Sequence, residues 1–314
     1  MTAAGVWAAN NVSAATASTV SGLQKKSFGL QTYSLTCDPK DKEFTNNVPG
    51  GLKRLSQMGY ATLELAGYNV DKNNEVKIGD LPIAEFKKHA DNVGLKIVSS
   101  HVGSAERGMH TKDNLQAHLD HWKRVADHHA AIGCKYVIQP GQPSTRNVAE
   151  VALVGEHYNK IGEVVKSAGL IFGFHNHDGE FQRVFPGGQM ALPLGRRGWP
   201  FGTPEGSKII MDGLLEVFDP SLVVFQLDVY WCVMGLQDPV AWMKKYSKHI
   251  KLLHIKDVSV LGESGMMNFQ KIFETAYANG IQDFFVELEN YRGGTQFEGV
   301  KGCADYLSKA AFVK

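Results

Sequence analysis

The chain has 314 residues, of which 43% are hydrophobic and 21% are charged, as is ordinary for a folded globular protein. Its 33 basic and 32 acidic side chains leave a formal net charge of +1, so no strong field draws it to nucleic acid or to an anionic membrane. No basic run interleaved with aromatic residues occurs, and no apolar run reaches the length needed to span a bilayer. The composition therefore argues against nucleic-acid and membrane partners.

The first residues differ in character from the rest of the chain. Residues 2–18 read TAAGVWAANNVSAATAS, which is small and weakly apolar, with A-x-A-like endings such as Ala15–Thr16–Ala17. This composition resembles the back half of a secretory signal peptide whose positively charged front is missing. We interpret residues 1–27 either as a leader remnant or as a disordered tail. The leader interpretation predicts export to the periplasm, with a cytoplasmic location as the alternative.

From residue 28 onward, short apolar runs alternate with longer amphipathic stretches. The apolar runs predict eight strands, in chain order Phe28–Leu35, Ala61–Leu65, Leu95–Ser100, Tyr136–Gln139, Leu170–His175, Leu222–Val229, Ile250–Ile255 and Phe284–Leu288. The amphipathic stretches predict helices over 51–58, Ile83–Val93, Asn114–Ile132, Val148–Ala168, Pro239–Ser247, Phe269–Asn279 and about 299–310. Pro82 before the second of these helices and Gly94 just after it are typical of helix ends.

Strands that alternate with helices indicate parallel strands joined by crossover helices, and eight of them predict a single (β/α)8 barrel, an α/β fold, over residues 28–314. A doubly wound open sheet is the alternative, but no G-x-G-x-x-G motif follows the first strand. Residues 182–206, rich in Gly and Pro, interrupt the alternation after the fifth strand. Such a long loop on the catalytic face suits a lid or a subunit contact, with Arg196, Arg197 and Trp199 as its working side chains.

Polar residues gather where the predicted strands end, which in a β/α barrel is the catalytic face. They are Glu64, His101, Gln139, His175, His177, Glu180, Asp228, His254, Lys256, Glu287 and Glu289. One such residue alone is typical of an ordinary barrel rim. Several carboxylates buried together without a cation would repel one another and lose their hydration, so the set predicts one divalent metal ion. Oxygen ligands with an imidazole favour Mn²⁺, with Mg²⁺ and Zn²⁺ as alternatives.

The remaining histidines fit no such cluster. Four of them, His118, His121, His128 and His129, lie on the predicted helix over Asn114–Ile132. We expect these side chains to be solvated, and the same expectation covers His89, His110, His157 and His249.

Five stretches resemble one known superfamily, in its order along the chain: Gly29–Leu35, Phe174–Phe181, Phe225–Trp231, Leu253–Asp257 and Phe285–Glu289. The chain resembles the xylose-isomerase-like TIM barrels, and more closely the sugar phosphate isomerase/epimerase family. The resemblance implies a metal held by Glu180, Asp228, His254 and a glutamate of the last strand. Spacing from Gly280 favours Glu287, whereas Glu289 points to the same side of the strand and lies nearer the rim, so both stay candidates.

The resemblance and the predicted metal together indicate proton transfer on a small carbohydrate. A cation that chelates a sugar's carbonyl and hydroxyl oxygens stabilises the enediolate formed when the neighbouring carbon loses a proton. The predicted bases are His175 and His177, with Glu287 as the other candidate, and the predicted substrate-binding residues are Glu64, His101, Gln139 and Lys256. We therefore expect a divalent-metal-dependent sugar isomerase or epimerase, and a homo-oligomer is compatible with the sequence.

Other functions of the same fold stay open. The same metal and base could expel a β-substituent, which would make the protein a lyase or dehydratase that cleaves 3-keto-glycosides or inosose-like substrates. A phosphodiester-cleaving nuclease would need a basic groove, which the near-neutral charge disfavours. A sugar-binding barrel without catalytic activity is a remote alternative, and the complete set of metal-binding residues argues against it.

Overall fold

The structure is a computed structural model, and it describes residues 26–105, 108, 110–187 and 206–314. The interpretation of residues 1–27 as a leader remnant or tail therefore falls almost wholly outside the described residues. The central part of the predicted insertion, with Arg196, Arg197 and Trp199, lies outside them as well.

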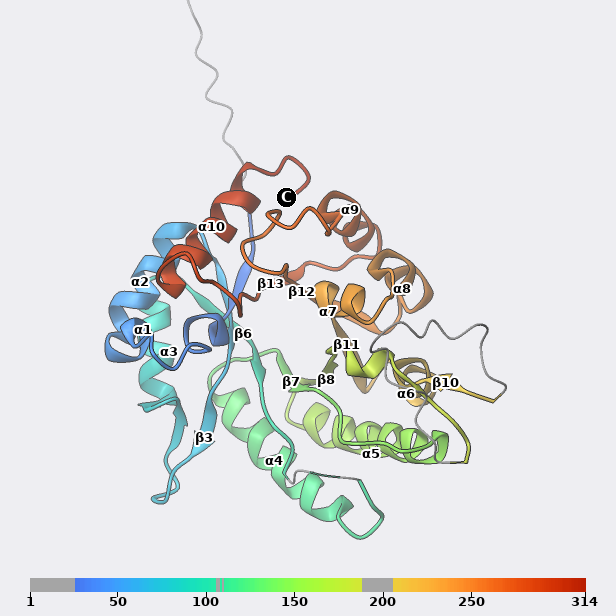
Figure 1. The fold of residues 1–314 in the computed structure, drawn as a ribbon. Helices are drawn as coiled ribbons and strands as arrows, with labels where there is room; N and C mark the ends of the chain where they lie inside the picture. The colour runs from blue at the N-terminus through green and yellow to red at the C-terminus, as the bar shows by residue number, and fades with distance from the viewer. Residues whose placement is uncertain (1–25, 106–107, 109, 188–205) are drawn as a thin grey trace, which may run out of the picture.

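Eight parallel strands form a closed barrel in the order β1-β13-β12-β11-β8-β7-β6-β2 (Figure 1). Their bounds are β1 Gly29–Gln31, β2 Thr62–Leu65, β6 Lys96–His101, β7 Tyr136–Pro140, β8 Ile171–His175, β11 Val223–Asp228, β12 Ile250–Ile255 and β13 Asp283–Val286. Each predicted strand has its counterpart in this barrel. The predicted (β/α)8 fold is confirmed.

Helices surround the barrel (Figure 1). They are α1 Glu43–Asn46, α2 Val48–Met58, α3 Ile83–Asn92, α4 Leu115–Ala131, α5 Val148–Ser167, α6 Ile210–Val217, α7 Val229–Met234, α8 Pro239–Lys245, α9 Phe269–Ala278 and α10 Gln296–Lys309. All seven predicted helices are present. Their ends follow the local sequence: the Asn47 side chain accepts a hydrogen bond from Gly50 N at the start of α2, and Gly59 ends that helix in the left-handed conformation, with φ of 100°.

Several elements were not predicted. The first strand is shorter than expected, because the chain turns at Gln31 into a 3₁₀ helix over Thr32–Leu35, and the Gln31 side chain accepts a hydrogen bond from Tyr33 N. Additional short elements are α1, α6, α7, the 3₁₀ helix Gly179–Phe181, the sheet of β3 Tyr68–Val70, β4 Val76–Ile78 and β5 Leu81–Pro82, and the ribbon of β9 Arg183–Val184 with β10 Lys208–Ile209. The β9–β10 ribbon joins the two described ends of the predicted insertion.

The barrel interior changes from apolar to polar along the strands. A small apolar cluster of Tyr136, Ile138, Val224, Leu252 and Phe285 packs separately from the main core beneath the helices. Side chains of a strand alternate between the two faces of a sheet, so residues two positions further along share the interior with this cluster. On the last three strands these residues are first Gln226, His254 and Glu287, and then Asp228, Lys256 and Glu289. The polar site therefore lies on an apolar floor.

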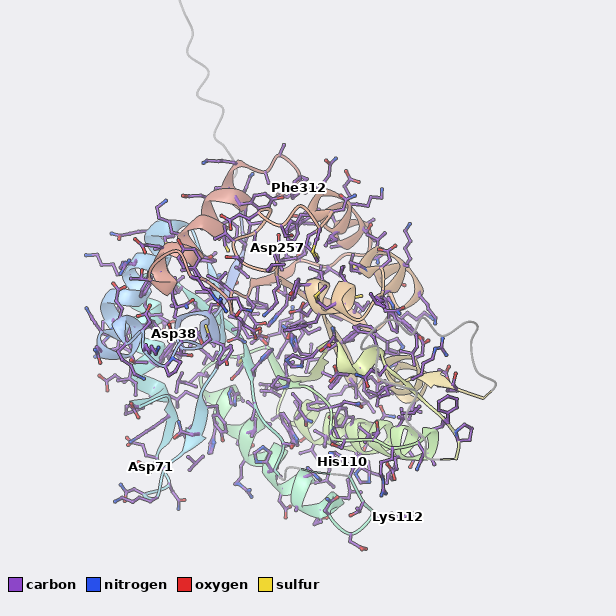
Figure 2. The ribbon with its side chains drawn as sticks, in the orientation of Figure 1. Asp38, Asp71, His110, Lys112, Asp257 and Phe312 are labelled. Atoms are coloured by element: carbon purple, nitrogen blue, oxygen red, sulfur yellow. The ribbon has the colours of Figure 1, made fainter. Side chains whose placement is uncertain are left out.

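Four histidines expected in solvent are buried instead: His110, His118, His129 and His157. That expectation was wrong for them, because the rings of His118 on α4 and His157 on α5 both contact that of His110, while the His129 ring packs against Tyr68 of β3. His110 Nδ1 lies 3.1 Å from His157 Nδ1, and the His110 ring stacks on that of His118 at 4.1 Å. Figure 2 shows His110 beside these helices, away from the centre of the barrel. Burial lowers the pKa of His110 to about 3 and that of His129 to about 4.

Mild acid should therefore destabilise the fold. His110 and His129 stay neutral in the folded chain but take up protons near pH 6.5 when unfolded, so their contribution to stability is complete above about pH 6.5 and falls below it. Each imidazole is expected to lower the free energy of unfolding by about 1.4 kcal/mol per pH unit between that pH and its folded pKa. Urea unfolding at pH 7.5, 6.0 and 5.0 measures the slope.

The variants H110Q and H129Q separate these histidines from the carboxyl groups, which also titrate in acid. Each variant is expected to be less stable at pH 7.5, yet to lose stability less steeply as the pH falls. Slopes equal to that of the unchanged protein in both variants would contradict the prediction.

Candidate active site

The polar layer of the barrel is organised around the carboxylate of Glu64. Glu64 ends β2, is fully buried, and accepts hydrogen bonds from Gln31 Nε2 at 2.9 Å, Ser99 Oγ at 2.6 Å and Gln226 Nε2 at 2.8 Å. His254 Nε2 also contacts this carboxylate. Gln226 and His254 come from β11 and β12, which do not neighbour β2 in the sheet. Glu64 therefore joins opposite sides of the barrel through its interior.

His254 lies between carboxylates on both sides of its ring. Its Nε2 faces Glu64, and its Nδ1 lies 3.3 Å from Glu287 Oε2 and 3.8 Å from Asp228 Oδ2. Burial opposes the charge of His254, but Glu64 and Glu287 more than offset it and raise its pKa to about 10. Burial likewise opposes the charge of Glu64, whose pKa is nevertheless lowered to about 2 by the positive charges of His101 and His254.

Two further imidazoles pack against His254. The His101 ring stacks on it at 5.0 Å, and the His175 ring lies 4.4 Å away. His101 Nε2 lies 2.7 Å from Gln226 Oε1 and 3.2 Å from Glu64 Oε2. Burial and the neighbouring His254 and His101 hold the pKa of His175 well below its usual range, so this ring is neutral. His175 Nδ1 is buried without a hydrogen-bond partner among the described residues.

Asp228 ends β11 with one oxygen engaged and the other unpartnered. Its Oδ1 accepts a hydrogen bond from Trp231 N at 2.8 Å, which caps α7, and its backbone N donates to Asn176 Oδ1 at 2.9 Å. Its Oδ2 is buried without a hydrogen-bond partner in the described part of the chain. Burial raises the pKa of Asp228 to about 7, although the positive charges of Lys256 and His254 oppose this rise.

Lys256 joins the two glutamates of the last strand and the loop after it. Its Nζ lies 3.0 Å from Glu287 Oε2 and 2.7 Å from Glu289 Oε2, and 5.4 Å from the centre of the Trp231 ring. Burial opposes the charge of Lys256, but Glu287 and Asp228 more than offset it and raise its pKa. Burial also opposes the charge of Glu287, whose pKa is nonetheless lowered well below its usual range by Lys256 and His254.

The residues at the centre fit a divalent cation. His175, Asp228, His254 and Glu287 each offer a ligand atom, and these four atoms lie within 4.8 Å of one another. A cation among them would satisfy the two buried atoms that lack partners, Asp228 Oδ2 and His175 Nδ1. The Glu64 carboxylate faces Nε2 of His254, which would leave Nδ1 of that ring for the metal, the usual arrangement of a metal-binding histidine held by a carboxylate.

Two of the predicted metal-binding residues lie outside this group. The Glu180 oxygens accept hydrogen bonds from the backbone N of Gln142 at 3.1 Å and of His177 at 2.7 Å. Glu289 pairs with Lys256. The group of four thus contains three of the predicted metal-binding residues, together with His175, which the sequence assigned as a base.

The other predicted site residues lie at or just after the carboxyl ends of β2, β6, β7 and β8. Glu64 and His101 have their polar atoms engaged with the protein beneath it. Gln139 donates from Nε2 to Tyr158 Oη at 2.5 Å, while its Oε1 has no hydrogen-bond partner among the described residues. The half-buried His177 lies with its ring 5.1 Å from that of His175 and 5.9 Å from that of Trp231.

Sequence reasoning missed four residues that hold this centre: Gln31, Ser99, Asn176 and Gln226. A signal existed for Gln226, which lies two residues before Asp228 on one strand and so faces the same side. Asn176, between two predicted bases, accepts a hydrogen bond from Asp228 N and thereby joins β8 to β11. Nothing in the spacing of Gln31 or Ser99 pointed to Glu64.

The fold agrees with the comparisons with known proteins. The sequence model of the family described as xylose isomerase-like TIM barrel matches residues 52–308, and the chain belongs to this family. The predicted family is thereby confirmed. None of the curated proteins matches the chain.

Two similar solved structures are crystal structures from Parabacteroides distasonis named sugar phosphate isomerase/epimerase. One is 43% identical over 92% of this chain and 100% of its own, with a TM-score of 0.82. The other is 42% identical over 94% of this chain and 97% of its own, with a TM-score of 0.83. The 3-keto-D-glucoside 4-epimerase of E. coli is 16% identical over 91% of this chain and 98% of its own, with a TM-score of 0.60, and shares the fold alone.

The prediction of export was wrong. It depended on the leader-like composition of residues 2–18, which the comparisons do not support: the similar structures are named sugar phosphate isomerase/epimerase, and nothing in those names indicates an exported protein. Among the residues that the structure describes, none of the helices is long and apolar enough to cross a membrane.

Replacing Lys256 should cost far more stability than replacing a lysine at the surface. In K256M, Glu287 would lose a buried partner, and we expect the free energy of unfolding to fall by roughly 3 to 5 kcal/mol. The matched control is K271M, which removes an exposed pair in which Lys271 Nζ lies 3.3 Å from Glu274 Oε2, and which should cost less than about 1 kcal/mol. Denaturant unfolding of metal-free protein measures both, and losses of similar size would refute the assignment of Lys256 as a buried ion-pair partner.

Proposed function

We propose that the protein is a divalent-metal-dependent sugar isomerase or epimerase that removes a proton from the carbon next to a carbonyl. The observation that carries the proposal is the buried group of His175, Asp228, His254 and Glu287, which gathers four ligand atoms at the carboxyl ends of the barrel strands. The names of the two similar Parabacteroides distasonis structures support the same class of reaction.

We assign the metal to Asp228, His254 and Glu287. The grouping in the structure contains all three, and the family resemblance implies the first two and a glutamate of the last strand. His175 is our fourth ligand, because its buried Nδ1 lacks a partner among the described residues, whereas the resemblance implies Glu180. Carboxylates with imidazoles favour Mn²⁺, with Mg²⁺ and Zn²⁺ as alternatives. When bound, such an ion would act as a Lewis acid toward the oxygens of the sugar.

The chain's own residues then divide the remaining work. With His175 as a ligand, His177 is the proposed base, because it lies beside His175 and Trp231 but outside the metal group. Glu287 is the other residue proposed to carry a proton. Lys256 is proposed to bind sugar hydroxyls. Gln139 is not, because it follows the interior residue Ile138 on β7 and donates to Tyr158 Oη on α5.

Glu64 and His101 are proposed as positioning residues. The Glu64 oxygens and His101 Nε2 already contact one another and Gln226, and Glu64 also contacts His254. They therefore fix the His254 ring, and we no longer assign them to substrate hydroxyls.

Exchange of solvent deuterium tests the proposed reaction. Protein stripped of metal and reloaded with Mn²⁺ is incubated in D₂O with a panel of aldoses and ketoses, and we expect deuterium on the carbon next to the carbonyl of recovered sugar or product. The variant H177Q should slow this exchange by roughly 10²- to 10⁴-fold while it keeps its Mn²⁺, because the metal ligands are intact and only the base is lost. K271M is the control that leaves exchange unchanged, and metal-replete protein that labels no sugar in the panel would refute the proposed function.

Mn²⁺ titration followed by electron paramagnetic resonance tests the ligand assignment. D228N and H175Q should each weaken Mn²⁺ binding by at least about 10-fold, because each removes a ligand. E180Q should weaken it less than H175Q, since the Glu180 oxygens accept hydrogen bonds from backbone N–H groups. The opposite order would replace His175 by Glu180 as the fourth ligand.

A further inference from the structure

We infer that the substrate is an uncharged sugar rather than a sugar phosphate, an inference that rests on the proposed function and specifies its substrate class. The observation is the balance of charge around the proposed metal group. A phosphorylated substrate carries close to two negative charges at neutral pH and needs cationic or N–H partners.

Lys256 is already committed to two carboxylates. Its Nζ lies within 3.0 Å of both Glu287 Oε2 and Glu289 Oε2, and the side chain is only 2% exposed. A phosphate that reached this ammonium would have to displace or approach the Glu289 carboxylate. The positive charge of Lys256 also opposes the rise in the pKa of Tyr33, Tyr230 and Asp228.

Within the described part of the chain, carboxylates outnumber cations around this lysine. Asp228, Glu287 and Glu289 gather about Lys256, while the Glu64 carboxylate lies beneath them, against His254. Glu180 adds a further carboxylate in the loop after β8. A divalent metal ion would reduce this excess of negative charge but would not reverse it. Like charges a few ångströms apart in a poorly hydrated site repel strongly, so the site disfavours a phosphate dianion.

The same region offers neutral hydrogen-bonding atoms. Gln142 Oε1 and Trp231 Nε1 are buried and lack hydrogen-bond partners among the described residues. They lie in or just after β7 and β11, at the carboxyl ends of the strands. A carbonyl oxygen accepts and an indole N–H donates a hydrogen bond, and hydroxyl groups can do both. Carboxylates such as Glu289 also accept hydrogen bonds from hydroxyls. The set suits the hydroxyls of an unmodified sugar.

Of the described arginines that follow barrel strands, Arg146 pairs with Glu150 and Arg183 donates a hydrogen bond to Ser207, so Arg124 and Arg292 are the alternatives for a phosphate. Arg124 lines a hollow of about 590 Å³ together with His121 and His128, between α4 and the β3–β4 hairpin. Arg292 is exposed in the loop after β13. A phosphate-binding role for either would show as a loss specific to phosphorylated substrates.

The test compares each sugar with its own phosphate ester. Mn²⁺-loaded protein is given ketohexoses and the corresponding 6-phosphates in D₂O, and kcat/KM for deuterium exchange is measured at low and at high salt. We expect the free sugar to be favoured at least 10-fold. The KM for the ester should fall as salt screens the carboxylates, whereas the KM for the free sugar should stay constant.

The variant E289Q removes one negative charge without removing bulk. It should improve kcat/KM for the ester several-fold relative to the free sugar, whereas a merely structural role of Glu289 would change both substrates alike and would count against the inference. A 10-fold preference for the ester, with KM raised for the ester alone in R124Q or R292Q, would overturn the inference and leave the proposed function intact. Exchange on neither member of any pair would refute the proposed function, and the inference with it.

Discussion

The structure depends on keeping carboxylates ionised in the interior of a barrel. Removing a carboxylate from water is costly, and bringing several together adds repulsion. His254 and Lys256 make this arrangement stable, because His254 lies between carboxylates from different parts of the barrel and Lys256 pairs with the two glutamates that follow β13. The low pKa of Glu64 and the raised pKa of His254 both reflect the contact between these two side chains. Asp228 Oδ2 lies 3.8 Å from His254 Nδ1 and has no hydrogen-bond partner among the described residues, and burial raises the pKa of this group instead.

The same constraint explains why the site fits a cation. An imidazolium at His254 supplies positive charge when no metal is bound, and a metal ion among the same ligands would supply it from a different atom. Glu64 serves both states, because its carboxylate can accept the Nε2 proton of His254 whether Nδ1 carries a proton or a metal. The apolar floor of Val224, Leu252 and Phe285 excludes water from below and keeps these electrostatic interactions strong.

Periodicity and topology were enough to predict the eight strands and the polar residues at their ends. Parallel strands that close into a barrel bring those ends to one rim, whichever sequence lies between them. Contacts across the barrel could not be predicted in this way. The hydrogen bond between Gln226 and Glu64 joins strands that do not neighbour each other, and the stagger of the barrel determines such pairs. No local pattern in the sequence records that stagger.

The buried histidines are a second case in which local sequence did not predict the structure. His118 and His129 were expected in solvent because a histidine is polar, but a neutral imidazole packs well in a helix interface once its proton is lost. Whether an imidazole is neutral depends on neighbours that are distant in sequence, such as His157 beside His110. The choice between His175 and Glu180 as metal ligand also depends on residues that are distant in sequence, because the loop after β8 folds back onto Gln142.

Lys256 also limits the chemistry that the site can perform on a carbonyl. A lysine forms a Schiff base only as the free amine, which requires a lowered pKa. Here the carboxylates around Lys256 raise its pKa, so the side chain is an ammonium at neutral pH. An ammonium donates hydrogen bonds and positive charge but cannot attack a carbonyl carbon. The carboxylates around Lys256 thus argue against an imine route, in agreement with the proposed proton abstraction next to a carbonyl.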